Sequence, residues 1–487
     1  MSTVLDRTEV QHRGLFINGQ EVPSASGETF DVLNPTDNSV LARVAKANRE
    51  DVDRAVAAAQ EAFSGPWSRM KTAERSALLS KVAQRIVERA PELAALESSD
   101  VGKPLKESRV EMPRASLNFR FFAELITKLN NESAPVDGDF LNYHQRRPVG
   151  VAALITPWNF PFMLTTWKAG PCLAAGNTCV IKPASVAPMT PLLLGEICAE
   201  AGLPEGVLNV IAGPGPVVGT RLAEHPDVKL ISFTGETVTG QTIMTTASKT
   251  LKRLSFELGG KSANVVFADA TWDEALAGSI RAIYANQGEV CLAGSRLLVE
   301  DRIYDRFLAD FIDRAGKLQI GNPLSESTDL GPLVSAEHLA RVRSYLEIAE
   351  GEGAKIVYGG KTPAGLEQGN FLQPTVIADV DSRMRCAQEE IFGPVVTVIR
   401  FKGEDEAVRI ANDSKYGLAG VVWTNDLRRA HRVAQAIDSG TIWVNCWFVR
   451  DLRVPFGGMK ESGIGREGGH WSLDFYTEQK NICIKLT

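Results

Sequence analysis

The sequence predicts an α/β protein built on two doubly wound parallel sheets. Between residues 147 and 258, short apolar runs alternate with helical segments, and the same alternation recurs between residues 263 and 445. Alternation of this kind is typical of parallel strands whose crossover helices cover both faces of the sheet. Right-handed crossovers then give an open, doubly wound sheet in each half. A glycine pair, Gly259 and Gly260, separates the two series.

The residues before the first series predict short strands followed by helices. The segment 14–46 alternates apolar residues with turns and carries an Asn-Gly hairpin signal at Asn18. Apolar side chains at helical spacing predict helices over 50–63, 72–98 and roughly 107–127.

The two alternating series supply the strands of the two sheets. The first predicts strands at 149–155, 178–182, 207–213, 228–235 and 252–258, with helices near 190–202, 216–224 and 238–248. The second predicts strands at 263–267, 295–300, 354–360, 419–423 and 440–445, with helices near 272–288, 303–317, 335–352, 404–412 and 426–437. Residues 128–147 and 473–487 lie outside both series. Each can offer an edge strand, which invites a partner chain.

Composition excludes several classes of protein. The 487 residues carry a net charge of −6, which disfavours binding to nucleic acid or to an anionic membrane. The 7 cysteines form no C-x-x-C pair, so zinc has no support, and their odd number suits a reducing compartment. The uncharged run 149–167 contains Pro157 and Pro161, which predict a buried strand and an irregular turn rather than a membrane span. Without a secretory signal, we expect a cytoplasmic protein.

Three polar side chains suggest catalysis. Cys291 lies between two glycines after a helical stretch, where a loop can present a thiol, although a lone cysteine is more often a small buried hydrophobe. Glu257 ends an apolar strand, where burial would suit it to general-base catalysis, or where it caps the next turn. Asn159 stands between two prolines after a strand, where its amide can donate to an oxyanion or form an Asx turn.

Two further loops at strand ends suit a ligand with phosphates. Lys182 follows a strand and can pair with ribose hydroxyls or phosphate. Gly235 lies between a strand and a helix, whose first backbone amides suit a pyrophosphate. The dinucleotide fingerprint G-x-G-x-x-G is absent in order, and the run 212–219 is only loosely similar to it.

Eight motifs, taken in order, resemble the aldehyde dehydrogenase superfamily. They are TPWNFP (156–161), VIKPAS (180–185), SFTGETVTG (232–240), FELGGKS (256–262), NQGEVC (286–291), EEIFGPV (389–395), NDSKYGLAG (412–420) and PFGGMKESGIGREGG (455–469). The likeness extends from about Ile17 to the C-terminus. It implies the aldehyde dehydrogenase fold, with two Rossmann-like domains and a small β flap for oligomerisation.

The resemblance also implies a division of the chain and an assembly. An NAD(P)-binding domain would comprise 1–127 and 147–258, and a catalytic domain would comprise 259–470. The oligomerisation flap would combine 128–146 with 471–487, and implies a homodimer or homotetramer.

The resemblance implies a covalent mechanism with NAD or NADP as cofactor and no metal. Cys291 would attack the aldehyde, the Asn159 amide and the Cys291 backbone N–H would hold the oxyanion of the thiohemiacetal, and Glu257 would activate the water that hydrolyses the thioester. The residues implied to bind the cofactor are Thr156, Pro157, Trp158, Lys182, Ala184, Ser185, Gly215, Phe233, Gly235, Glu236, Leu258, Glu390 and Phe392.

Two of these positions depart from the family pattern. Many NAD-linked members carry glutamate at the position of Ser185, where a carboxylate accepts the ribose hydroxyls and repels a 2′-phosphate. Serine removes that repulsion, as in NADP-using relatives, so both cofactors stay open. Glu236 replaces a serine often found there, and because a carboxylate is unfavourable beside a pyrophosphate, we expect its side chain to turn away.

Segments 112–122, 369–394 and 445–458 resemble the family branch that oxidises 2-hydroxymuconic, 2-aminomuconic and carboxymethyl-hydroxymuconic semialdehydes. These ring-cleavage products carry a carboxylate far from the aldehyde. Arginine binds carboxylates in a bidentate manner, so Arg114, Arg450 and Arg453 are candidate anchors unless they form surface or interdomain ion pairs. The implied apolar walls are Phe160, Trp167 and Phe456.

Three other functions remain to be weighed. Ser185 favours an aliphatic substrate such as succinate semialdehyde. Glu257 disfavours a coenzyme-A-acylating enzyme, which needs no activated water. The presence of Cys291, Glu257 and Asn159 together disfavours a non-enzymatic binding protein of the same fold.

Overall fold

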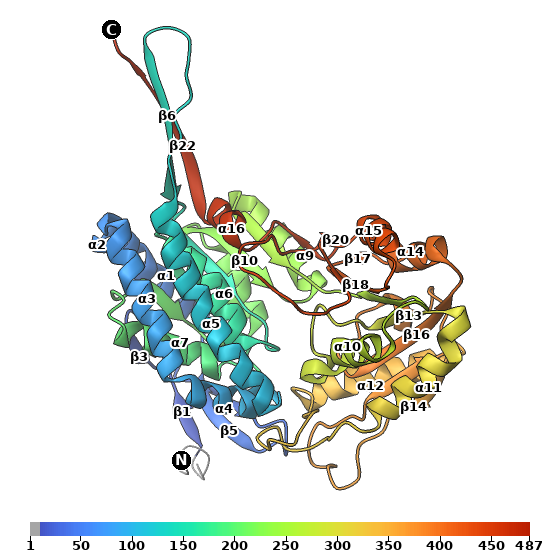
Figure 1. Ribbon diagram of the computed structural model, residues 1–487. Helices are drawn as coiled ribbons and strands as arrows, with labels where there is room; N and C mark the ends of the chain where they lie inside the picture. Colours follow the sequence, from blue (N-terminus) through green and yellow to red (C-terminus); the bar gives the residue numbers. More distant parts are fainter. Residues whose placement is uncertain (1–9) are drawn as a thin grey trace.

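The computed structural model describes residues 10–487, which form two α/β units and a long two-stranded arm (Figure 1). The first unit contains an eight-stranded sheet in the order β21-β11-β10-β7-β8-β9-β2-β3. Its strands are β2 (Leu15–Ile17), β3 (Gln20–Val22), β7 (Val151–Ile155), β8 (Thr178–Lys182), β9 (Leu208–Val210), β10 (Val228–Thr234), β11 (Arg253–Glu257) and β21 (Gly463–Ile464). The strands from β11 to β9 are parallel, as predicted, whereas β2, β3 and β21 are antiparallel additions at the edges.

Helices cover both faces of this sheet because successive strand residues alternate between two apolar cores. Ala152 and Leu154 of β7 lie in one core, and Val151, Ala153 and Ile155 lie in the other. The helices of this unit are α1 (Arg49–Ser64), α2 (Pro66–Arg69), α3 (Thr72–Glu88), α4 (Ala90–Val101), α5 (Leu105–Leu125), α6 (Pro161–Ala174), α7 (Met189–Glu200), α8 (Thr220–Glu224) and α9 (Thr237–Ala247).

The sequence-based predictions for the first unit missed two features of its helices. The predicted helix 72–98 is two helices, because the chain turns at Arg89, and Pro91 in the first turn of α4 cannot continue α3. The irregular turn expected after Asn159 is short, since α6 begins at Pro161. Proline is well suited to a first helical position, where its missing N–H has no partner to lose.

The second unit contains a seven-stranded sheet in the order β14-β15-β16-β13-β12-β18-β19, parallel except for β14. Its strands are β12 (Ala263–Val266), β13 (Arg296–Glu300), β14 (Lys355–Tyr358), β15 (Thr375–Ala378), β16 (Val395–Phe401), β18 (Ala419–Trp423) and β19 (Thr441–Val444). The analysis of the sequence missed β15 and β16, because only the four-residue helix α13 (Arg385–Gln388) marks a crossover between them.

The helices of the second unit follow the predicted series closely. They are α10 (Trp272–Tyr284), α11 (Tyr304–Ala315), α12 (Ala336–Gly351), α14 (Glu404–Asn412) and α15 (Leu427–Ala436). The helix predicted over 272–288 ends early: after Tyr284 the chain enters a tight turn, η4 (Ala285–Gly288), with Asn286 and Gln287 in the left-handed region.

The two segments outside both series pair with each other. β6 (Phe140–Pro148) and β22 (Thr477–Lys485) form an antiparallel ribbon that projects from the first unit in Figure 1. The first residues of the predicted flap segment 471–487 are not part of this ribbon. They belong to α16 (Gly469–Tyr476), which buries Leu473 and Tyr476 in the core of the first unit.

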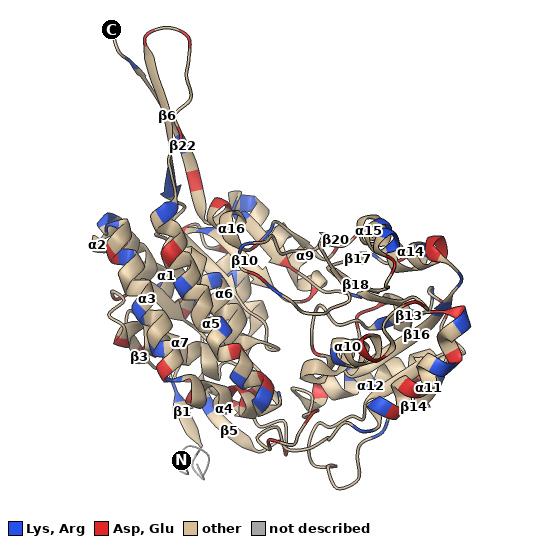
Figure 2. Cartoon of the chain, in the orientation of Figure 1, with Lys and Arg blue, Asp and Glu red and all other residues tan. Residues whose placement is uncertain are grey.

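The remaining strands form small sheets near the units. β1 (Gln11–Arg13), β5 (Val40–Ala45) and β4 (Thr29–Leu33) make a three-stranded sheet, and β17 (Tyr416–Gly417) pairs with β20 (Met459–Lys460). In Figure 2, acidic and basic residues are interspersed on the outer helices, and some form helical ion pairs, such as Arg85 with Glu88. Within residues 10–487, no helix is both long and apolar enough to cross a membrane.

The parallel strands of the first sheet place several candidate residues at one edge. In the ladder, Ile155 is opposite both Lys182 and Phe233, and Thr234 is opposite Glu257. The carboxyl ends of β7, β8, β10 and β11 therefore meet, which is where open α/β sheets bind ligands.

Candidate active site

The candidate nucleophile and the candidate base come from different units and meet. Cys291 lies on the loop after α10, and Glu257 ends β11. The Cys291 thiol donates a hydrogen bond to Glu257 Oε1 across 3.4 Å. Burial raises the pKa of the Cys291 thiol well above its ordinary value, so the resting thiol is protonated. Burial, and then the charge of Glu467, raises the pKa of Glu257, which makes its carboxylate a stronger base.

Asn159 is fixed onto the loop that carries the cysteine. Its Nδ2 donates to the backbone oxygen of Glu289 across 2.7 Å, and Asn286 Nδ2 donates back to the Asn159 backbone oxygen across 3.0 Å. Asn159 and Cys291 line the same cavity of about 160 Å³. An amide nitrogen carries two hydrogens, so one N–H of Asn159 is engaged and the second is available for an oxyanion.

Contacts from three directions hold the left-handed turn before Cys291. Asn286 and Gln287 have φ angles of 46° and 55°, which non-glycine residues adopt only when their surroundings require it. Glu107 Oε2 accepts from the Asn286 backbone N–H at 2.9 Å, and Gln287 Nε2 donates to the Pro332 backbone oxygen at 3.2 Å. Glu289 Oε1 accepts from the Val334 backbone N–H at 3.0 Å. The loop is therefore held in one conformation.

A continuous groove extends from this cavity along the strand ends of the first sheet. The cavity of about 160 Å³ and a neighbouring one of about 460 Å³ share lining residues from Pro157 to Trp158 and from Thr234 to Glu236. Twelve of the candidate cofactor residues line the groove: Thr156, Pro157, Trp158, Lys182, Ala184, Gly215, Phe233, Gly235, Glu236, Leu258, Glu390 and Phe392. Ser185 does not line it, and its hydroxyl donates to the Gly213 backbone oxygen at 2.8 Å.

The groove offers charged and polar groups suited to a nucleotide. Burial lowers the pKa of Lys182 to about 8, and its ammonium donates to the Pro183 backbone oxygen at 2.9 Å. Burial raises the pKa of Glu390 to about 7, and its Oε1 accepts from the Gly260 backbone N–H at 2.9 Å. At Gly215 an added Cβ would meet no atom within 4 Å, so the wall is open there. α9 begins immediately after Glu236, and its N-terminus favours an anion.

An ion pair joins the two units across this groove. Glu236 Oε1 lies 2.8 Å from Arg341 Nη2 on α12, and both side chains are about half exposed. His338, one turn earlier on α12, donates from Nε2 to the Phe392 backbone oxygen at 2.6 Å and packs edge-on to Trp158. Burial lowers the pKa of His338 to about 4, so its ring is neutral near pH 7. His338 and Arg341 carry no local sequence signal that links them to the first unit.

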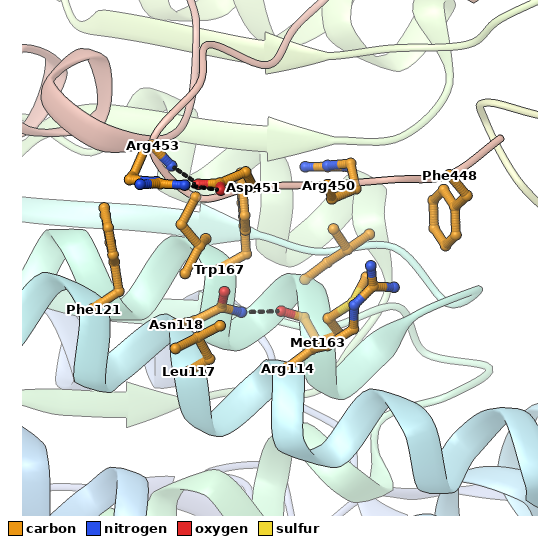
Figure 3. Close-up of a pocket in the computed structure, with 12 residues that line it drawn as sticks. Arg114, Leu117, Asn118, Phe121, Met163, Trp167, Phe448, Arg450, Asp451 and Arg453 are labelled. Carbon is orange, nitrogen blue, oxygen red and sulfur yellow. Dashed lines mark hydrogen bonds and ion pairs between the residues drawn. The ribbon is translucent and has the colours of Figure 1, made fainter. Parts of the chain in front are cut away.

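A second apolar cavity of about 330 Å³ contains the candidate substrate arginines (Figure 3). Its walls are Arg114, Leu117, Asn118 and Phe121 of α5, Met163, Leu164 and Trp167 of α6, and Phe448 with residues 450–453 of the loop after β19. The Arg114 guanidinium lies 5.4 Å from the Phe448 ring centroid. Arg450 lies over Phe456 at 3.5 Å and over Trp167 at 4.8 Å.

The other candidate substrate residues are less well placed to contact a substrate in this cavity. Arg453 forms an ion pair with Asp451 at 2.7 Å and its side chain is 78% exposed, which matches the ion-pair alternative. Phe456 packs beneath Arg450, and Phe160 lies behind Phe448 with their ring centroids 6.3 Å apart, so both support the cavity wall from outside.

A buried polar cluster that the sequence analysis missed lies beside the candidate base. Lys168 Nζ lies 2.8 Å from Glu467 Oε1, and the Ser232 hydroxyl donates to the same oxygen at 3.1 Å. Trp167 Nε1 donates to Glu467 Oε2. The position of Glu467 in the last motif, GREGG, was the one available signal.

Within the described chain, no group of three or more His, Cys, Asp or Glu side chains is arranged to hold a metal.

Comparisons with known proteins agree with this geometry. The model of the Aldehyde dehydrogenase family matches residues 22–482. The chain is 48% identical, over 98% of its length and 100% of the relative, to 2-hydroxymuconic semialdehyde dehydrogenase of Pseudomonas sp. (strain CF600). It is 46% identical, over 94% of its length and 97% of the relative, to 5-carboxymethyl-2-hydroxymuconate semialdehyde dehydrogenase of Escherichia coli.

A solved structure gives the same result for the fold. The NAD⁺ complex of aldehyde dehydrogenase from Bacillus cereus is 41% identical, with a TM-score of 0.96 over 98% of this chain and 97% of that chain. The fold and the family resemblance predicted from the eight motifs are confirmed. The chain therefore belongs to the aldehyde dehydrogenase family and is an oxidoreductase that acts on aldehydes.

Proposed function

We propose that this enzyme oxidises a semialdehyde from aromatic ring cleavage, of the 2-hydroxymuconic semialdehyde type, to the dicarboxylic acid with NAD(P)⁺. The observation that carries the proposal is the cavity with two arginines. Within residues 10–487 neither Arg114 nor Arg450 lies within 4 Å of a carboxylate, and both contact aromatic rings, while the charges of Glu257 and Glu467 act on Arg450 from farther away. Unpaired charges in an apolar cavity are unfavourable until an anion binds, and a bidentate carboxylate is the anion that guanidinium groups match best.

The names of the relatives support the same substrate class. Two of them are dehydrogenases of 2-hydroxymuconic and 5-carboxymethyl-2-hydroxymuconate semialdehyde. Such substrates have an aldehyde at one end and a carboxylate at the other. In this proposal Cys291 takes the aldehyde end, while Arg114 and Arg450 take the carboxylate.

The residues of the site account for the chemistry in two halves. In the first half, the Cys291 thiol passes its proton to Glu257, and the sulfur attacks the aldehyde carbon. The free Asn159 N–H and the Cys291 backbone N–H stabilise the resulting oxyanion. The chemistry that NAD(P)⁺ supplies when bound is acceptance of the hydride from the thiohemiacetal carbon, which leaves a thioester on Cys291.

In the second half, Glu257 acts again as a base. After the proton taken from Cys291 has passed to solvent, Glu257 takes a proton from a water molecule, which attacks the thioester carbon and releases the acid and the Cys291 thiolate. The proton on Glu257 then returns to the thiolate. The raised pKa of Glu257 fits this role, because a base is most effective when its pKa approaches the working pH.

The groove fits a dinucleotide. We propose that Lys182 binds the adenosine ribose, that the start of α9 near Gly235 binds the pyrophosphate, and that Glu390 and Phe392 place the nicotinamide ribose and ring. The Ser185 hydroxyl presents no charge that would repel a 2′-phosphate. Both NAD⁺ and NADP⁺ are therefore proposed as cofactors.

The division into domains and the assembly are also proposals. The first sheet would form the NAD(P)-binding domain, the second sheet would form the catalytic domain, and the ribbon of β6 and β22 would join copies of the chain into a homodimer or homotetramer. The exposed edges of a two-stranded ribbon favour pairing with another chain. Light scattering of the purified protein measures the assembly directly, and a monomer would refute this proposal.

A paired initial-rate assay tests the substrate. Formation of reduced cofactor is followed with 2-hydroxymuconic semialdehyde, succinate semialdehyde and a neutral dienal, each with NAD⁺ and with NADP⁺. We expect a kcat/KM at least about 100-fold higher for the muconic substrate than for the neutral dienal, because a paired buried charge contributes about 2–5 kcal/mol. A preference for succinate semialdehyde with NADP⁺ would show that Ser185 was the better guide.

A further inference from the structure

Besides Arg114, Arg450 and the ion pair of Asp451 with Arg453, the cavity is lined by the side-chain amide of Asn118 (Figure 3). Asn118 follows Arg114 by one turn of α5, so both side chains lie on the same face of the helix. Asn118 is 3% exposed, and its neighbours along the cavity wall include the apolar side chains of Leu117 and Phe121.

Two hydrogen bonds fix the orientation of this amide. Asn118 Nδ2 donates to Thr166 Oγ1 at 2.9 Å and to the Met163 backbone oxygen at 3.3 Å, both on α6. A backbone carbonyl can pair only with the NH₂ group of an amide, so the reversed orientation would place two oxygens against each other. Asn118 Oδ1 consequently points away from Met163 and into the cavity, as Figure 3 shows.

The Oδ1 atom accepts no hydrogen bond from any residue between 10 and 487. An acceptor on a cavity wall loses its hydrogen bonds to water when an apolar group of a ligand covers it, whereas the same acceptor becomes stabilising when a ligand donates to it. Besides the ion pair of Arg453 with Asp451, the cavity therefore offers two cationic groups and one neutral acceptor, and Arg114 and Asn118 lie on one face of α5.

We propose that Asn118 Oδ1 selects substrates with a hydrogen-bond donor on the carbon next to the carboxylate, such as an enolic hydroxyl or an amino group. This inference rests on the proposed function, because it takes the carboxylate to lie between Arg114 and Arg450. A keto tautomer presents an oxygen acceptor at that carbon, which repels Oδ1. Asn118 is thus a specificity-determining residue that favours the enol form over the keto form and over substrates without the hydroxyl.

The experiment compares two substrates in one set of variants. The substrates are 2-hydroxymuconic semialdehyde and the same dienal carboxylate without the hydroxyl. For the parent enzyme we expect kcat/KM to be about tenfold higher with the hydroxylated substrate, the factor expected for one hydrogen bond. In Asn118→Leu that ratio falls to within about twofold of one, because the acceptor is lost.

A matched control separates recognition from anchoring. Thr166→Val removes the hydroxyl that Asn118 Nδ2 contacts but leaves Oδ1 in the cavity, so the substrate ratio stays at the parent value. If Asn118 only anchors α5 to α6, then Asn118→Leu and Thr166→Val lower kcat/KM for both substrates alike, and the proposal is wrong.

A measurement on the parent enzyme covers the case in which Asn118→Leu does not fold. Competitive inhibition by 2-hydroxymuconate is compared with inhibition by muconate, and we expect about tenfold tighter binding of the hydroxylated acid. Equal inhibition overturns the proposal for Asn118 even if both acids bind far more tightly than a neutral analogue. If the neutral analogue binds equally well, the proposed function itself fails.

Discussion

The loop that carries Cys291 and the cavity that holds Arg114 differ in what holds their side chains, although the loop also buries three polar atoms that have no partner in residues 10–487, namely Asn286 Oδ1, Gln287 Oε1 and Glu289 Oε2. In the loop, Glu107, Asn159 and Glu289 each make a hydrogen bond that fixes a strained or catalytic position. In the cavity, the guanidinium groups contact rings and Asn118 Oδ1 has no donor within the described chain. Under the proposed function, hydrogen bonds position the cysteine loop before the substrate binds, whereas the polar groups of the cavity are left for the substrate to pair.

Removal of the thiol tests the loop most severely. Cys291→Ala should lower kcat by more than about 10⁴-fold, because without a nucleophile the covalent route is lost. Binding of NAD⁺, followed by quenching of protein fluorescence, should be retained because the groove is unchanged. Substantial aldehyde oxidation by this variant would contradict the assignment of Cys291.

Loss of the base should separate the two halves of the reaction. Glu257→Gln should form one equivalent of reduced cofactor more slowly than the parent enzyme, because Cys291 must give its proton to solvent, and should then slow by a further factor of about 10²–10⁴, because the thioester is no longer hydrolysed efficiently. In the parent enzyme, the hydrolysis rate should rise with pH through a pKa above the ordinary carboxyl value, since only the deprotonated Glu257 accepts a proton. Rapid quenching with mass spectrometry detects the acylated Cys291. Normal steady-state turnover in Glu257→Gln would refute the role.

Removal of a cavity arginine should affect only carboxylated substrates. Arg450→Leu should lower kcat/KM for 2-hydroxymuconic semialdehyde by about 30- to 1,000-fold, because a buried charge pair is lost. Oxidation of a neutral dienal should change by less than about threefold. Arg453→Leu is the matched control: Asp451 already neutralises Arg453, so both substrates should be affected little. Equal losses for the charged and neutral substrates would refute the anchor.

The sequence could reveal the residues that local patterns mark, but not those that are held by contacts with distant parts of the chain. Strands 178–182 and 419–423 were predicted at their observed limits, because each centres on a short apolar run between helical segments. Glycines and prolines marked the turns that place Asn159 and Gly235. Glu107 carries no such signal, because its partner Asn286 lies 179 positions away in the chain.

A hydrogen bond between the two units gives a smaller effect on the loop. Glu107→Leu should lower kcat by about tenfold, because the Asn286 N–H loses its acceptor and the left-handed turn relaxes. Glu107→Gln retains an acceptor oxygen and should recover most of the activity. The rate of Cys291 alkylation by iodoacetamide reports the loop directly, and the Kd for NAD⁺ should stay the same. A change confined to the Kd for NAD⁺ would show that Glu107 does not position the cysteine.

The weakest expected effect belongs to the ion pair between Glu236 and Arg341, because both side chains are about half exposed and solvent screens them. Exposed pairs contribute about 0.2–1 kcal/mol, so a change of no more than about fivefold is expected. Glu236→Gln should tighten NAD⁺ binding by about two- to fivefold, because a carboxylate near the pyrophosphate is removed and Arg341 is freed to approach it. Arg341→Gln should weaken binding instead. The Kd values, measured by fluorescence at low and high salt, should converge as salt rises. Opposite signs for the two variants would show that Arg341 pairs with Glu236 in the free enzyme and turns to the cofactor when the cofactor binds. Equal weakening in both variants would show that the ion pair instead holds the two units together, as the contacts of the cysteine loop do.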